Sequence, residues 1–138
     1  MNILYTAVAT AVGDGRDGSV RSSDGLIDVN LAVPSEMGGQ GGATNPEQLF
    51  AAGYAACFHN ALRRVARRAN ADVTASEVTA RVGLGTAGGG TFGLAVTLEV
   101  SLPGVDPETA RRLVDTAHQV CPYSNATRGN IDVNLVLS

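Results

Sequence analysis

The chain has 138 residues, of which 44% are hydrophobic, and its ten basic and thirteen acidic residues give a net charge of −3. This length suits one domain with a substantial apolar core, which we expect to span residues 1–138. The weak negative charge excludes a general electrostatic footprint for nucleic acid or an anionic membrane. No apolar run approaches the roughly 20 residues that span a bilayer, and no signal peptide is recognisable, so we expect a cytoplasmic protein.

The first third of the chain predicts three short antiparallel strands. Residues 3–12 are rich in alternating and β-branched positions. The runs 20–22 and 26–33 flank Ser23-Asp24-Gly25, and Asp-Gly between two extended runs is a strong hairpin signal.

Two glycine-rich loops accompany these strands. Gly13–Gly18 is expected to form a tight loop that places Arg16 at its tip or folds it inward. Residues 34–44, PSEMGGQGGAT, contain too much glycine for regular structure and predict a surface loop.

The stretch NPEQLFAAGYAACFHNALRRVARR, residues 45–68, predicts a long helix. Asn45 suits the N-cap, Pro46 suits the first helical position and Gln48 suits the partner position of a capping box. The arginines at its other end complement the helix dipole. The helix is apolar on almost every side, which is typical of a buried helix, so we expect Cys57 inside the protein.

The remaining chain predicts strands over 77–84, 91–102 and 131–137, because apolar residues alternate there. A flexible glycine-rich loop should join the first two. Between the last two, a second helix should begin at Asp106-Pro107-Glu108. Cys121 lies at the end of that helix, where the following proline disfavours helical geometry. We therefore expect Cys121 to be easier to reach and to move than the first cysteine.

Three kinds of chemistry are disfavoured by these residues. Zinc binding by Cys57, His59, His118 and Cys121 is not expected, because the first two are only two positions apart on a helix and point in different directions. His59 is predicted at a polar helix edge and His118 on a helix surface. Cysteine hydrolysis would need His118 as base, with no evident orienting partner. Arginines 63–68 are more simply explained as a helix end than as a nucleic-acid patch.

Two-cysteine redox catalysis uses more of the sequence. Desolvation keeps a thiol in an apolar helix protonated, so a fixed positive charge is needed to form a thiolate. Arg16 could supply that charge, and Glu47 could hold it, although the helix dipole explains a first-turn acid equally well. If Cys57 and Cys121 pair in a reducing compartment, redox chemistry is favoured over a structural disulfide.

The blocks NPEQLFAAGYAACF and CPYSNATRGNIDV, with LYTAVATAV and GRDGSV, resemble the organic hydroperoxide resistance proteins of the osmotically inducible protein C (OsmC) superfamily. The resemblance covers nearly the whole chain. It implies an α+β fold in which antiparallel sheets pack around a long central cysteine-bearing helix and a second helix, in an interlocked homodimer. Members of the family are thiol peroxidases that reduce organic hydroperoxides, including those of fatty acids, in the oxidative stress response.

The resemblance also implies roles for four residues. Cys57 matches the peroxidatic cysteine, Cys121 the resolving cysteine, Arg16 the activating arginine and Glu47 the glutamate that pairs with it; Arg21 is a nearby alternative to Arg16. The implied cycle forms a Cys57 sulfenic acid and then a Cys57–Cys121 disulfide. The implied electron donor is a dihydrolipoyl group on lipoylated enzyme proteins, and no bound cofactor is expected.

An organic peroxide also requires an apolar pocket. The candidates for its lining are apolar or aromatic side chains spread along the chain, namely Leu26, Met37, Phe50, Phe58, Phe92 and Tyr123. Each is equally well explained as core. The alternative function is a non-catalytic module that binds a fatty-acyl ligand or senses oxidation, with a cysteine that is merely buried.

Overall fold

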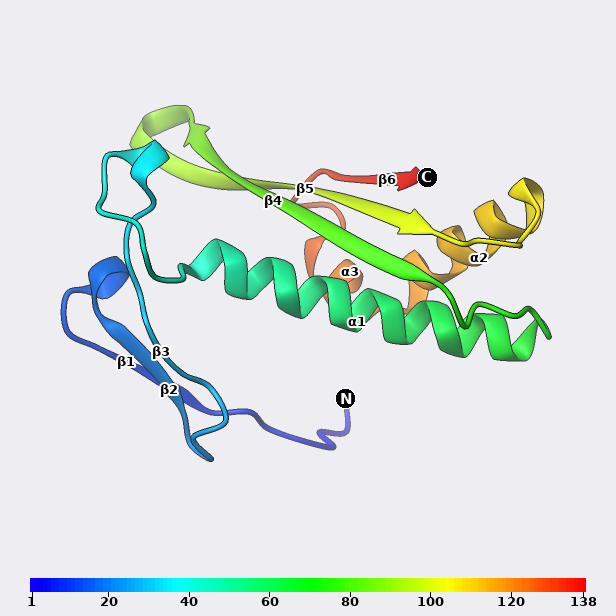
Figure 1. Ribbon diagram of the computed structural model, residues 1–138, viewed down its shortest axis with the longest axis horizontal. Helices are drawn as coiled ribbons and strands as arrows, with labels where there is room; N and C mark the ends of the chain where they lie inside the picture. The colour runs from blue at the N-terminus through cyan, green and yellow to red at the C-terminus, as the bar shows by residue number, and fades with distance from the viewer. The chain divides into compact units, whose positions relative to one another are not determined.

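The computed structural model describes residues 1–138, which form two compact units, Met1–Leu49 and Phe50–Ser138. The first unit holds a three-stranded antiparallel sheet in the order β1-β2-β3 (Figure 1). Its strands are β1 (Ala9–Val12), β2 (Ser19–Ser22) and β3 (Asp28–Asn30). The three antiparallel strands are confirmed, but β1 is shorter than predicted because β2 pairs only with Ala9–Val12 and the preceding residues have no partner strand in the chain.

The loop between β1 and β2 contains the short 3-10 helix η1 (Gly15–Asp17), and a second one, η2 (Ser35–Met37), follows β3. Close backbone packing fixes the first loop. A Cβ atom at Gly18 would lie 2.2 Å from the carbonyl oxygen of Val12, so no other residue fits there without moving the backbone. The loop therefore holds Arg16 within a defined turn.

The long helix α1 (Pro46–Arg68) carries the chain from the first unit into the second. Its predicted N-cap is confirmed, since the Gln48 backbone N–H donates to Asn45 Oδ1 at 2.8 Å. The predicted reciprocal bond of a capping box is not made. The Gln48 side-chain oxygen instead accepts a hydrogen bond from Thr44 Oγ1 at 2.8 Å. This hydroxyl, four residues earlier in the chain, takes the place of the Asn45 backbone N–H as the donor.

The second unit contains the hairpin of β4 (Glu77–Ala87) and β5 (Thr91–Ser101), joined by the 3-10 turn η3 (Gly88–Gly90). The predicted flexible loop is shorter than expected because Ala87 pairs with Thr91. Helix α2 (Pro107–Val120) follows, with the Thr109 N–H donating to Asp106 Oδ2 at 3.0 Å as the sequence predicts.

A short helix α3 (Pro122–Thr127), which the sequence did not predict, leads to β6 (Val133–Leu137). The expectation of purely antiparallel sheets is wrong for this last strand, because β6 pairs with β5 in parallel. The cause is the helical crossover between them, which returns the chain to the same end of the sheet. The second sheet is therefore mixed, in the order β4-β5-β6.

The core of the second unit lies between α1, α2 and this sheet, which lie close together in Figure 1. Its largest fully buried apolar side chains are Tyr54, Phe58, Leu62, Leu98, Val100 and Val114. The expectation that α1 is buried on every side is wrong, because Ala52 and Ala56 are exposed. Within this chain, the core covers only one side of the helix.

Candidate redox site

Two free thiols face each other where α1 meets the junction between α2 and α3. Cys57 lies in the middle of α1, and Cys121 occupies the break that the following Pro122 imposes, with an extended ψ of 124°. The two Sγ atoms are 3.5 Å apart. A disulfide bond is about 2.05 Å long, so this is the reduced pair at a distance that a small movement could close.

Exposure distinguishes the two thiols. Cys121 is fully buried, whereas Cys57 is only half-buried. The expectation that Cys121 is the easier one to reach is wrong. Cys121 belongs to the buried core at the end of α2, and α3 begins at the next residue. The helices before and after Cys121 therefore shield its thiol from solvent. Cys57 is therefore the thiol that a ligand from solvent can contact.

Burial raises the pKa of the Cys57 thiol, and its hydrogen bond with Cys121 raises that pKa further. The backbone N–H of Tyr123, in the first turn of α3, acts in the opposite direction because it stabilises a thiolate. The net direction is upward. Conversion of Cys57 to a nucleophilic thiolate therefore needs an additional positive charge, as the sequence reasoning expected.

A buried polar network anchors α3, which begins directly after Cys121. The Tyr54 hydroxyl lies 2.8 Å from Ser124 Oγ and 3.2 Å from Thr127 Oγ1, and His118 Nδ1 lies 2.8 Å from Ser124 Oγ. Because buried polar groups are costly to leave unpaired, these bonds fix the position of α3 on α1. The network thus holds the segment that carries the second thiol.

The predicted environment is wrong for His118 and correct for His59. His118 is not a surface group but is half-buried in the network, and burial, together with the nearby Arg128, lowers its pKa while Asp115 opposes the shift. His59 lies at a half-buried edge of α1, where its Nε2 atom is 2.9 Å from Ser76 Oγ. Neither histidine is part of a cluster of metal-ligating side chains.

Gly53 in α1 gives space to the ring of Tyr123. A Cβ atom at this position would lie 3.1 Å from the Tyr123 hydroxyl and 3.2 Å from its Cε2 atom. The Tyr123 ring also packs against Phe50 and Tyr54, with ring centroids 6.1 Å and 5.7 Å apart. The small residue therefore lets the start of α3 approach α1 beside Cys57.

In the first unit, Arg16 and Glu47 form a bidentate ion pair. Arg16 Nη1 donates to Glu47 Oε1 at 2.6 Å, and Nη2 donates to Oε2 at 3.2 Å. The glutamate side chain is only 17% exposed, against 38% for the arginine. This hydrogen-bonded pairing raises the pKa of Arg16 above its usual value, so its charge is permanent. The structure thus brings these two predicted residues together.

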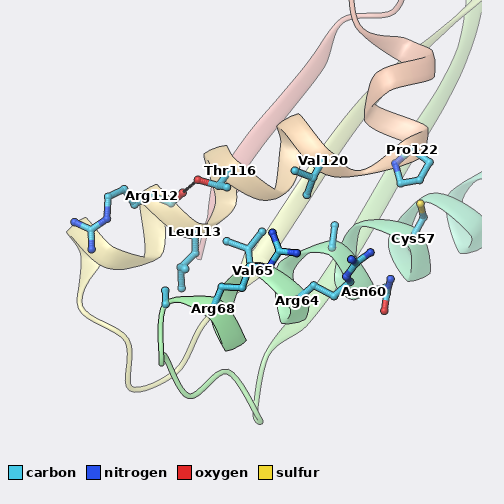
Figure 2. A pocket seen from close by; sticks show the side chains of 12 residues that line it. Cys57, Asn60, Arg64, Val65, Arg68, Arg112, Leu113, Thr116, Val120 and Pro122 are labelled. Atoms are coloured by element: carbon cyan, nitrogen blue, oxygen red, sulfur yellow. Dashed lines mark hydrogen bonds between the residues drawn. The ribbon is translucent and has the colours of Figure 1, made fainter. Parts of the chain in front are cut away.

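A groove of about 520 Å³ begins at Cys57 and continues between α1 and α2. Figure 2 shows Cys57 and Pro122 at one end, with Arg64 and Arg68 further along and Arg112 beyond them. The lining is mainly apolar along its length, with contributions from Ala61, Val65, Leu113, Val120 and Pro122. The groove is large enough for an organic molecule that reaches the Cys57 sulfur.

None of the six residues predicted for a substrate pocket lines this groove. Phe58 is fully buried in the core, and Phe50 and Tyr123 form the aromatic cluster with Tyr54. Leu26, Met37 and Phe92 are exposed. The residues that sequence reasoning missed had a usable signal, because Ala61, Arg64, Val65 and Arg68 follow Cys57 at helical spacing and lie on its side of α1.

No helix of the structure combines the length and the apolar character needed to cross a membrane. No group of three or more His, Cys, Asp or Glu side chains is placed to hold a metal ion.

Comparison with known proteins identifies the family of the chain. The family model described as OsmC-like protein matches residues 39–136. An organic hydroperoxide resistance protein of Xanthomonas axonopodis pv. citri is 54% identical, over 99% of this chain and 96% of that protein. The chain belongs to the OsmC-like family. Within this family it is similar to the organic hydroperoxide resistance proteins.

Two solved structures of OsmC-like proteins support the fold. An organic hydroperoxide resistance protein from Legionella pneumophila is 50% identical and superposes with a TM-score of 0.94, covering 99% of both chains. One from Elizabethkingia anophelis is also 50% identical, with a TM-score of 0.95, and covers 100% of this chain and 99% of that one. The expected α+β OsmC-like fold is thus confirmed.

Proposed function

We propose that this protein is a cysteine-based peroxidase that confers organic hydroperoxide resistance by reducing organic hydroperoxides, including those of fatty acids, to alcohols. The observation that carries the proposal is the 3.5 Å separation between a half-buried Cys57 sulfur and the buried sulfur of Cys121. An accessible thiol next to a sheltered second thiol suits a peroxidatic and a resolving cysteine. The names of the similar proteins support the class of substrate.

In the first step, the Cys57 thiolate attacks the outer oxygen of the hydroperoxide. A sulfur–oxygen bond forms, the oxygen–oxygen bond breaks, and the alkoxide takes a proton and leaves as the alcohol. Cys57 becomes a sulfenic acid, the reversible first level of thiol oxidation. The apolar groove at Cys57 supports a substrate with an organic tail over hydrogen peroxide.

We assign activation of Cys57 to Arg16 and positioning of that arginine to Glu47. Burial raises the pKa of Cys57, so a permanent cation is required, and a guanidinium that already uses two N–H groups on Glu47 has others free for a thiolate or peroxide oxygen. Glu47 lies in the first turn of the helix that carries Cys57. The resemblance of the glycine loop to that of known members supports the same assignment.

In the second step, the Cys121 sulfur attacks the sulfenic sulfur of Cys57. A disulfide forms, and the sulfenic oxygen leaves as water with one proton from the Cys121 thiol. A dihydrolipoyl group on a lipoylated enzyme protein then opens the disulfide by thiol exchange, so that both cysteines are reduced and the lipoyl group is oxidised. No bound cofactor takes part in this cycle.

We further propose that the protein forms an interlocked homodimer. Large apolar side chains are exposed in the first unit, namely Ile3, Leu4, Tyr5, Val8, Val12 and Leu26. An apolar surface of this kind is typical of a protein interface. Light scattering coupled to gel filtration should give twice the 14.1 kDa mass of the chain, and a monomer at micromolar concentration would contradict this part of the proposal.

The decisive experiment measures consumption of an alkyl hydroperoxide with dihydrolipoamide or thioredoxin as reductant. We expect turnover with dihydrolipoamide and little with thioredoxin. Cys57→Ser should abolish peroxide reduction, whereas Cys121→Ser should stop at a sulfenic acid that dimedone labels. Wild-type turnover by Cys57→Ser would exclude the peroxidase and leave the non-catalytic acyl-binding or sensing module as the explanation.

A further inference from the structure

The arginine-rich end of α1 is divided between two surfaces of the second unit. Arg64 and Arg68 line the groove that begins at Cys57, whereas Arg63 and Arg67 line a separate small depression. Helical geometry explains the division, because positions seven and eleven residues after Cys57 return to its side of the helix. Two of the four arginines are thus aligned with the reactive thiol.

Neither Arg64 nor Arg68 has an ion-pair partner within the chain. Acidic partners are present for other arginines, since Arg81 pairs with Glu99 and Arg111 with Asp115. Apolar side chains such as Val65 and Val120 line the same groove as the thiol and these two arginines. One groove therefore holds a thiol, apolar side chains and three arginines without an ion-pair partner in the chain, because Arg112 of α2 also lines it (Figure 2).

We infer that Arg64 and Arg68 form a carboxylate-recognition subsite, which selects hydroperoxides whose alkyl chain ends in a free carboxylate. The inference rests on the proposed peroxidase function and assigns specificity to residues outside the redox centre. Guanidinium groups bind carboxylates through paired N–H donors, and the apolar channel accommodates the alkyl segment between them and the sulfur. Arg112 of α2 adds a third positive charge to the lining of the same groove.

The helix also sets a length for the ligand. Arg64 and Arg68 lie seven and eleven residues beyond Cys57, which at about 1.5 Å per residue places them roughly 10 to 16 Å along α1. Because long helical side chains lean toward the N-terminus, the guanidinium groups lie closer to the sulfur than this interval along the helix axis. A ligand that contacts both the sulfur and an arginine therefore needs a chain of several carbons, which tert-butyl hydroperoxide lacks.

The test compares two double variants that remove the same charge from the same helix end. Arg64→Gln/Arg68→Gln changes the groove, and Arg63→Gln/Arg67→Gln is the matched control. Each is assayed with a long-chain fatty-acid hydroperoxide, with its methyl ester and with tert-butyl hydroperoxide. Because the guanidinium groups are exposed and partly screened, we expect KM for the free acid to rise about five- to tenfold in the groove variant only.

The methyl ester and tert-butyl hydroperoxide should show no change in either variant, and kcat should stay constant because the redox centre is intact. Equal losses for acid and ester, or equal losses in the two double variants, would overturn the subsite. Circular dichroism and thermal melts check that all variants fold. Comparing each variant with wild type on one substrate cancels differences in solubility between acid and ester.

A binding experiment separates this inference from the peroxidase proposal. Calorimetric titration of the reduced protein with laurate, which carries no peroxide, should give about five- to tenfold weaker binding in the groove variant and no change in the control. Arginine-dependent laurate binding without peroxide turnover would refute the peroxidase and retain the subsite. If the protein turns over peroxide but its laurate binding does not depend on Arg64 and Arg68, the subsite is refuted and the peroxidase proposal is retained.

Discussion

The Sγ atoms of Cys57 and Cys121 lie 3.5 Å apart, and the thiol at the helix end is the fully buried one. The end of helix α2 at Cys121 does not expose this thiol, because α3 follows immediately and buries Ser124 and Thr127. A thiol that is sheltered from solvent in this way is protected from direct oxidation by solvent peroxide.

Alkylation of the reduced protein should follow this difference in exposure. Iodoacetamide should modify Cys57 at least about tenfold faster than Cys121, because only the former reaches the groove. Peptide mass spectrometry over a time course measures both rates. In urea the two cysteines should react equally, and faster labelling of Cys121 in the folded protein would contradict the structure.

The bidentate pair between Arg16 and Glu47 predicts that lysine cannot replace arginine. Arg16→Lys keeps the charge but cannot form two parallel hydrogen bonds with Glu47, so we expect peroxide reduction to slow by about tenfold or more. Arg21→Lys is the matched control, because Arg21 is exposed and its Nε lies 3.9 Å from Asp28. Stopped-flow measurement of the first oxidation step decides it, and a larger loss with Arg21→Lys would transfer the activating role to that residue.

The Tyr54 hydroxyl predicts a measurable contribution to stability. Tyr54→Phe removes its bonds to Ser124 and Thr127 in a fully buried place, so we expect a loss of about 1 to 2 kcal/mol in the free energy of unfolding. Urea denaturation measures it. Tyr123→Phe is the control, since Tyr123 is 41% exposed and its hydroxyl makes no hydrogen bond within the chain, so its removal should change stability very little.

The same substitution should slow the second chemical step. When α3 is less firmly anchored, Cys121 spends less time next to the sulfenic acid, so disulfide formation should be slower than in wild type while the first oxidation is unchanged. Dimedone trapping at successive times reports the lifetime of the sulfenic acid. A lifetime equal to that of wild type would show that the network stabilises the fold without positioning the thiol.

The lowered pKa of His118 leads us to expect that the protein loses stability on acidification. Its pKa in the folded protein lies below the ordinary value of 6.5, chiefly through burial, so the unfolded chain binds the proton more readily. The contribution of neutral His118 to the free energy of unfolding is fully present above pH 6.5. It is lost as the pH falls from 6.5 through the lower pKa of the folded protein. His118→Asn, which keeps a polar group for Ser124, should flatten this part of the profile.

Urea midpoints measured across the mildly acidic range test this expectation. His59→Gln serves as the control, because it changes the other histidine of the chain and leaves the environment of His118 intact. The control should retain the wild-type slope. If the slope disappears with His59→Gln instead, the acid sensitivity belongs to the bond with Ser76.

Local features of the chain are determined by its sequence. Asn45 and Asp106 start their helices because a cap depends on donors only three residues away, and Pro122 ends α2 through a clash with its immediate neighbour. Apolar alternation likewise identifies the paired strands β4 and β5. The two cysteines and the family resemblance follow from residue identity and spacing alone.

Relationships between distant parts of the chain are decided only by the tertiary structure. The burial of Cys121, the bond between Tyr54 and Ser124 and the parallel pairing of β6 join residues whose proximity depends on how helices and strands pack. The groove also depends on the tertiary structure. The spacing on α1 aligns Arg64 with Cys57, but only the packing of α2 supplies the second wall of the groove. Periodicity shows which side of an element is apolar, whereas packing determines what that side meets.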